Sequence, residues 1–92
     1  MAKVISNEKG FLIIEASSFE MIDKLGKYGS LGLCDSCLKA DHKGKYIAVL
    51  NQWFCSSCYD EWVNRATRYT EDIPFEECKF NQYKKLLNPT DQ

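Results

Sequence analysis

The chain has 92 residues, of which 45% are hydrophobic and 27% charged, and this composition is typical of one globular domain rather than of a disordered segment. Twelve Lys and Arg against 13 Asp and Glu leave a formal charge of −1, which argues against a protein that holds duplex nucleic acid mainly through phosphate contacts. The longest apolar run, residues 11–14, is far too short to cross a membrane, so we expect no membrane partner.

The start of the chain bears on the state of its cysteines. Residues 1–8 contain no long apolar stretch and soon carry an acid, so they do not resemble a secretory signal, and we expect a cytoplasmic protein. Thiols stay reduced in that compartment. Five cysteines in so short a chain therefore indicate metal ligands rather than disulfides.

The first third of the chain predicts a β-hairpin. Residues 3–6 and 11–16 have the apolar, β-branched character of two short strands. Between them lies the sequence Asn-Glu-Lys-Gly, in which Gly10 can take the positive φ that a tight turn favours.

A short helix is expected directly after this hairpin. Ser17 and Glu20 have the spacing of a capping box, in which a serine side chain and an acid three residues later bond free amides of the first turn. Three apolar residues spaced three apart are expected to form its buried stripe: Phe19, Ile22 and Leu25. The helix is expected to end near Gly26 or Gly29.

The middle of the chain predicts a second hairpin followed by a second helix. Residues 45–50 and 52–55 read as strands around a turn at Asn51. Ser56 or Ser57 is expected to cap the helix. Its buried face is expected to consist of residues at helical spacing: Tyr59, Trp62, Val63 and Ala66.

A third helix is expected to begin at Asp72, before Pro74, and to stop at Asn88 and Pro89. Its buried side is expected to comprise Phe75, Cys78, Tyr83, Leu86 and Leu87. A position on this stripe favours a buried structural role for Cys78 over that of a reactive thiol, which needs an exposed, electropositive setting.

The other four cysteines form the pattern C-x2-C-x17-C-x2-C, made by Cys34, Cys37, Cys55 and Cys58. Two intervening residues let both sulfurs of a pair face one point, and two such pairs complete a tetrahedron. Zn²⁺ accepts four thiolates in this geometry, so we expect one tetrahedral zinc ion held by these residues. Iron bound by the same four thiolates stays open as an alternative.

This arrangement resembles the treble-clef zinc fingers, and its spacing is similar to that of GATA-type fingers and of the second finger of LIM domains. The resemblance covers residues 33–69 and implies a zinc knuckle, a β-hairpin and a helix whose first turn supplies the last ligands. We therefore expect a single α+β domain over residues 1–92: a small treble-clef zinc ribbon with an N-terminal hairpin and helix (1–32) and a C-terminal helix (70–92). One departure is Leu38, where such knuckles often carry glycine.

The resemblance to LIM-like fingers implies a non-enzymatic module that mediates protein–protein interaction. Four thiolates leave no open coordination position for a reacting water, which also disfavours catalysis at the metal. Exposed aromatics could anchor a protein partner, and Tyr46 and Trp53 are the candidates. The sequence does not indicate an oligomeric state.

Nucleic-acid binding is the alternative function. A loop carrying Lys39, Lys43 and Lys45, beside the same two aromatics, could hold single-stranded RNA by charge and stacking. GATA-type DNA binders add a basic tail after the finger. Here residues 59–92 contain seven acids and five bases, which disfavours such docking.

A more distant resemblance is to the HNH nucleases, carried by Asp41-His42, Asn51 and the second cysteine pair. In that family the first histidine is the general base, and a second histidine binds the catalytic metal. Tyr59 stands where the second histidine would be expected, and His42 is the only histidine of the chain. An ordinary solvated loop residue is therefore the preferred reading of His42.

Overall fold

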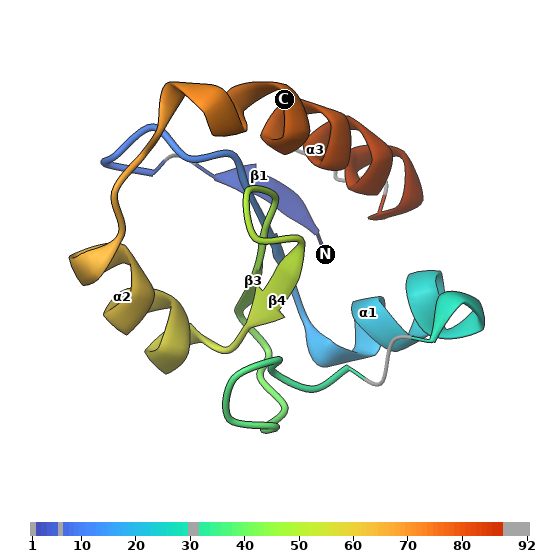
Figure 1. Ribbon diagram of the computed structural model, residues 1–92. Helices are drawn as coiled ribbons and strands as arrows, with labels where there is room; N and C mark the ends of the chain where they lie inside the picture. Colours follow the sequence, from blue (N-terminus) through green and yellow to red (C-terminus); the bar gives the residue numbers. More distant parts are fainter. Residues whose placement is uncertain (1, 6, 30–31, 88–92) are drawn as a thin grey trace.

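The computed structural model describes residues 2–5, 7–29 and 32–87 and confirms the α+β class (Figure 1). Four strands form one antiparallel sheet in chain order: β1 (Lys3–Ile5), β2 (Ile13–Ala16), β3 (Gly44–Ile47) and β4 (Gln52–Phe54). Within these residues the α-helices are α1 (Ser18–Leu25), α2 (Ser56–Arg65) and α3 (Ile73–Leu87). Short 3₁₀ turns follow α1 (Gly26–Tyr28) and precede α3 (Thr70–Asp72).

Both predicted hairpins are present, and the pairing of β2 with β3 joins them into one sheet. Ile13 lies opposite Ile47 in this pairing, and both side chains are fully buried. The second hairpin is shorter than predicted, because β3 ends at Ile47 and residues 48–51 form the turn. Asn51 takes a left-handed φ of 55° in that turn, a conformation that Asn tolerates better than most residues.

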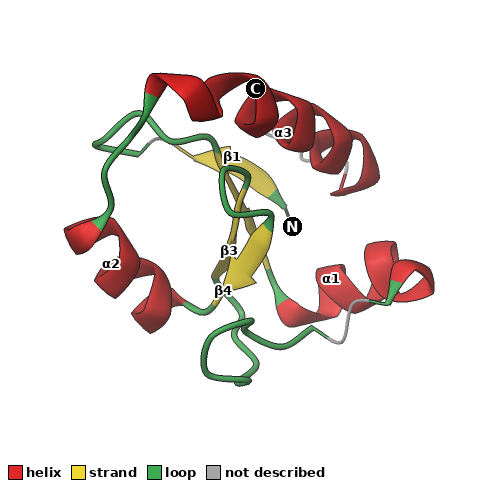
Figure 2. Ribbon diagram, viewed as in Figure 1, coloured by secondary structure: helices red, strands yellow, loops and turns green. Residues whose placement is uncertain are grey.

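Helices cover both faces of the sheet (Figure 2). Helix α2 packs on one face, where the ring of Trp62 lies 4.7 Å from that of Phe11. Helices α1 and α3 lie on the other side of the sheet and contact each other. On that side Tyr83 of α3 stacks on Tyr46 of β3, with ring centroids 4.0 Å apart. The sheet is therefore the middle layer of the molecule.

The capping box of α1 is confirmed, but its predicted buried stripe is correct only at Leu25 and wrong at Phe19 and Ile22. Ser17 Oγ accepts the amide of Glu20 at 3.2 Å, and Glu20 Oε1 accepts the amide of Ser17 at 3.0 Å. Phe19 is 72% exposed and Ile22 is 51% exposed, whereas Met21 and Leu25 are buried. The helix turns its Met21–Leu25 side toward the core because that is the side on which α3 lies.

The buried stripe of α3 also differs from the prediction. Leu87 is buried and Tyr83 and Leu86 are half-buried, but Phe75 and Cys78 are exposed. The expectation of a buried Cys78 is thus wrong. Its predicted stop at residues 88 and 89 lies outside the described residues.

Glu76, one of the seven acids of residues 59–92, is the side chain that α3 buries in its first turns, at 1% exposure. Its Oε1 accepts from the Arg68 guanidinium and its Oε2 from the amide of Leu12, both at 2.8 Å. A buried carboxylate needs such partners, and their positions fix which side of α3 faces the first hairpin.

No helix in the described ranges is both long and apolar enough to span a membrane.

Candidate metal centre

The first cysteine pair lies in a tight turn between α1 and β3. The amide of Leu38 donates to the carbonyl of Cys34, and the amide of Cys34 donates to the carbonyl of Lys39, each at 2.9 Å. Leu38 takes a φ of 65°, the left-handed conformation that glycine adopts without steric cost. The turn therefore keeps the backbone of a glycine-containing knuckle although the residue is leucine, and the Leu38 side chain is exposed.

The second pair lies where β4 passes into α2. Cys55 is the N-cap residue of the helix, and its carbonyl accepts the amide of Tyr59 at 2.9 Å. Cys58 is in the first turn. Because the first amides of a helix have no partners within the helix, they lie available to a negative charge at this position.

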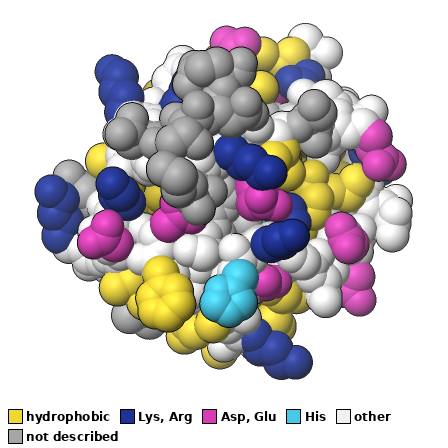
Figure 3. Space-filling view, turned by 180° about the vertical axis from the view of Figure 1, so that it is seen from behind, with side chains coloured by type: hydrophobic (Ala, Val, Ile, Leu, Met, Phe, Trp, Pro, Cys, Tyr) yellow, Lys and Arg dark blue, Asp and Glu magenta, His cyan; other side chains and the backbone are white. Residues whose placement is uncertain are grey.

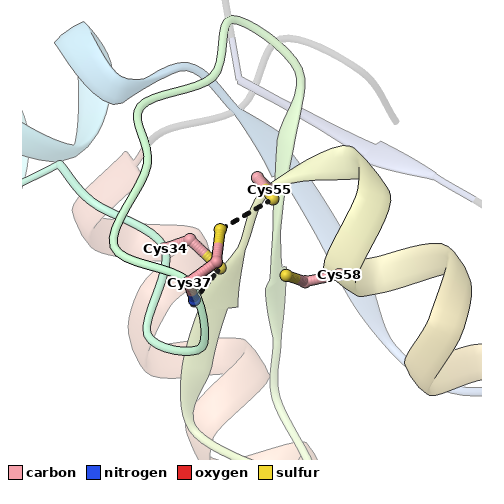
Figure 4. A group of neighbouring side chains, drawn as sticks. All are labelled: Cys34, Cys37, Cys55 and Cys58. Carbon is pink, nitrogen blue, oxygen red and sulfur yellow. Dashed lines mark hydrogen bonds between the residues drawn. The ribbon is translucent and has the colours of Figure 1, made fainter.

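The structure brings together the four cysteines that the sequence spacing selects (Figure 4). Their sulfur atoms all lie within 4.8 Å of one another, and the sulfurs of Cys37 and Cys55 are 3.5 Å apart. A tetrahedron with metal–sulfur distances of about 2.3 Å has sulfur–sulfur edges of about 3.8 Å. The cluster therefore has the size that a single metal ion requires, and all of its donors are thiols.

The surroundings stabilise negative charge on one of these sulfurs. The buried Cys34 sulfur accepts the amides of Ser36 at 3.3 Å and Cys37 at 3.4 Å. Burial opposes ionisation of this thiol, but the backbone amides around it outweigh burial and lower its pKa to about 7.

Two other thiols of the cluster, those of Cys37 and Cys58, have raised pKa values instead. Burial raises the pKa of the Cys58 thiol to about 12, and burial together with a hydrogen bond to Cys55 raises the pKa of Cys37. Thiols of this kind lose their protons when a cation supplies the compensating charge. Full ionisation of the cluster therefore requires a bound cation.

Two aspartates that the sequence does not link to the cysteine cluster connect it to the fold. Asp35, inside the first pair, accepts the amide of Trp53 through Oδ2 and donates its own amide to the carbonyl of Trp53, each at 2.9 Å. Asp41 Oδ2 accepts the amide of Ser56 at 2.7 Å and Oδ1 accepts that of Lys43 at 2.9 Å. These bonds lower the pKa of Asp41.

The cap of α2 is therefore supplied by Asp41, and the prediction that Ser56 or Ser57 caps the helix is wrong. Ser56 instead donates its hydroxyl to the carbonyl of Lys43 at 2.9 Å. The bond from the Lys43 amide to Asp41 is local, and the sequence can indicate it because aspartate often accepts the amide two residues later. The bond to Ser56 spans 15 residues and has no such signal.

The two aromatics predicted as exposed anchors are buried, so this expectation is corrected. Tyr46 is 1% exposed and donates its hydroxyl to Asn51 Oδ1 at 2.7 Å. Trp53 is 3% exposed and donates Nε1 to the carbonyl of Ala16 at 3.1 Å. Both lie opposite each other on the sheet face that α3 covers, where the largest apolar groups are needed to fill the core.

The three candidate lysines have different surroundings. Lys39 and Lys43 are exposed. Lys45 is half-buried: its ammonium lies 3.7 Å from Glu15, 3.4 Å from the hydroxyl of Ser56 and over the ring of Tyr59. Lys45 is therefore already paired within the fold.

The residues behind the nuclease resemblance have other partners. His42 is exposed, with its ring 6.4 Å from that of Phe19. Asn51 accepts the hydroxyl of Tyr46, and the hydroxyl of Tyr59 accepts the side-chain amide of Asn7 at 2.7 Å.

Comparison of the chain with protein-family models, with curated proteins and with solved structures finds no match.

Proposed function

We propose that this chain is a non-enzymatic, zinc-stabilised module of the treble-clef type and that it mediates protein–protein interaction, as LIM-like fingers do. The observation that carries the metal assignment is the meeting of four sulfur atoms from two distant segments within 4.8 Å. Bound zinc would cross-link the turn that carries Cys34 and Cys37 to the end of β4 and the first turn of α2. Zinc is proposed over iron because structural sites made of four cysteines most often hold zinc.

The proposal of a scaffold rather than a reaction centre follows from the donor set. Four thiolates complete a tetrahedral coordination shell, so a substrate or a reacting water would find no free position. Cys34 and Cys55 are moreover buried, and the Cys34 sulfur accepts two backbone amides.

A protein partner is better supported than a nucleic acid. Stacking on bases would need exposed aromatics beside the lysine loop, but Tyr46 and Trp53 are buried and Lys45 is paired with Glu15. On the described part of the face drawn in Figure 3, basic and acidic side chains are interspersed. A surface of mixed charge attracts phosphate chains weakly.

A pull-down from nuclease-treated extract tests this function. Zinc-loaded protein is expected to retain a stoichiometric protein partner, and chelated protein is expected to lose it. The alternative is tested with single-stranded polyuridylate and the double variant Lys39→Glu, Lys43→Glu, which changes the two exposed lysines. Salt-sensitive binding of this RNA that the double variant abolishes, without any protein partner, would favour the nucleic-acid function instead.

A further inference from the structure

A second feature of the molecule lies away from the cysteine sulfurs. A cavity of about 900 Å³, open to solvent, lies between α1, the turn that carries Cys34 and Cys37, the turn between β3 and β4, and α3. Cavities that hold ligands typically measure about 300–1,000 Å³, so this one is large enough for several residues of a peptide.

The interior of the cavity is apolar and aromatic. Its walls are made by Met21 and Leu25 of α1, Tyr46 and Trp53 of the sheet, and Tyr83 and Leu86 of α3. Tyr46 and Trp53, which are not the exposed anchors that the sequence suggests, thus form its floor. Tyr46 and Trp53 are only 1% and 3% exposed, so a bulky apolar side chain placed here would pack mainly against the half-buried Tyr83 and Leu86. The exposed Leu33 and Leu38 line the same cavity.

Side-chain amides surround this apolar interior. Gln52, Asn81 and Gln82 line the cavity, are exposed, and make no side-chain hydrogen bond within the described part of the chain. Each of these amides offers both donors and an acceptor, which is the combination that a peptide backbone needs.

The charges of the cavity also favour an uncharged occupant. Asp35 and Lys85 are its charged lining side chains, so one negative and one positive group balance. A phosphate chain or a strongly charged peptide would gain little from such a lining.

The outer edge of β4, next to the cavity, has no free backbone groups at Trp53 with which another strand could pair. The backbone amide and carbonyl of Trp53 that face outward from β4 are both bonded to Asp35. A segment bound here would therefore contact side chains, rather than extend the sheet at this point.

We propose that this cavity binds an uncharged peptide segment of the partner protein, with one bulky apolar side chain in the apolar interior and the flanking backbone on the three amides. This inference rests on the proposed interaction function and names the chemistry of its partner. It places the docking site between α1 and α3, and not on the exposed lysines.

Amide NMR spectra of the zinc-loaded, ¹⁵N-labelled protein test the proposal. The probes are capped pentapeptides Gly-Ser-X-Ser-Gly in which X is Trp, Leu, Ala or Asp. The Trp and Leu peptides are expected to shift signals of cavity residues such as Leu25, Gln52 and Leu86, whereas the Ala and Asp peptides are not. No shift with any peptide at millimolar concentration, or shifts centred on the exposed face of Phe19 and Ile22, would overturn the proposal.

Matched tryptophan variants locate the binding. Asn81→Trp fills the mouth of the cavity from an exposed helical position, and Asn64→Trp makes the same change on α2, on the other side of the sheet. We expect Asn81→Trp to weaken binding of the Trp peptide about tenfold or more and Asn64→Trp to leave it unchanged. Equal effects of the two variants would contradict the assignment.

Two further results separate the possibilities. If N-acetyltryptophanamide binds as tightly as the Trp pentapeptide, the flanking backbone contributes nothing and the peptide proposal fails in favour of a small-molecule cavity. If a protein partner is still captured at full yield by Asn81→Trp, the interaction function stands and this docking site is wrong.

Discussion

At the scale of single residues, the five cysteines divide into two chemical groups. Four have their sulfurs within 4.8 Å of one another, and the fifth, Cys78, is exposed on α3. A cation shared by the four would protect them from thiol reagents while leaving Cys78 reactive. Their positions, rather than their intrinsic chemistry, distinguish them.

Replacing one cysteine from each group tests this division. Cys55→Ser removes a buried donor and is expected to lower the bound zinc several-fold and to unfold at least residues 33–69, because metal binding and folding are coupled. Cys78→Ser is the matched control and is expected to change neither zinc content nor the melting temperature. Metal analysis and circular dichroism of both variants provide the measurements. Full zinc content in Cys55→Ser would remove Cys55 from the ligand set.

Glu76 carries the second prediction at this scale. Glu76→Gln converts a carboxylate with two hydrogen bonds into an amide beside Arg68, whose buried Nε already makes no hydrogen bond. We expect the free energy of unfolding to fall by about 2–4 kcal/mol, since a partly buried guanidinium loses its counter-charge. Glu77→Gln, on the exposed neighbour, is expected to change it by less than about 0.5 kcal/mol. Equal stability of the two variants in urea unfolding would show that the ion pair is not structural.

At the scale of elements, the first turns of α1 and α2 are joined through Asp41. Its backbone carbonyl accepts the amide of Ser18, its backbone amide donates to the hydroxyl of Ser18, and its carboxylate caps α2 at Ser56. One residue thus holds the start of both helices beside the metal site.

Asp41→Ala is expected to cost about 1–2 kcal/mol of stability at neutral pH, the usual range for loss of a helix cap. The folded pKa of Asp41 is lowered, so its contribution is present above the unfolded value of about 3.9 and is lost as pH falls through the folded value. The stability difference between the parent and Asp41→Ala should therefore shrink in acid. Asp60→Ala, at an exposed position of α2, is the control and is expected to have little effect. A constant difference down to acid pH would contradict an ionised cap.

The elements also show what local pattern can predict. The hairpins, the capping box and the buried face of α2 were predictable, because each depends on residues near one another in the chain. The faces of α1 and α3 were not. Helix α1 carries apolar residues on more than one side, so its sequence does not show which side is buried. The position of α3 decides that Met21 is buried and Ile22 is exposed. Likewise the burial of Glu76 depends on Leu12, which is 64 residues away.

The same distinction applies to the candidate site. The clustering of the four cysteines was predictable, since the C-x2-C spacing is itself a geometric constraint. The roles of Asp35 and Asp41 beside the cluster were not predictable, because they depend on backbone amides of β4 and α2 that only the fold brings to them. The burial of Tyr46 depends likewise on α3, where Tyr83 covers it.

At the scale of the whole molecule, two hairpins far apart in sequence share one sheet and helices cover both of its faces. A domain of this size buries a modest fraction of its surface and is only marginally stable by packing alone. Binding of zinc to a site of four thiolates contributes about 10–16 kcal/mol, comparable to the total stability of a small domain. The metal is therefore expected to decide whether the centre of this molecule is folded.

Native mass spectrometry combined with metal analysis and circular dichroism, before and after addition of excess chelator, tests this claim most directly. The account predicts one zinc ion per chain, and predicts that chelation removes the ion together with much of the ordered structure and the cooperative melting transition. A purified protein that contains no metal, or that keeps an unchanged melting curve after complete chelation, would contradict it.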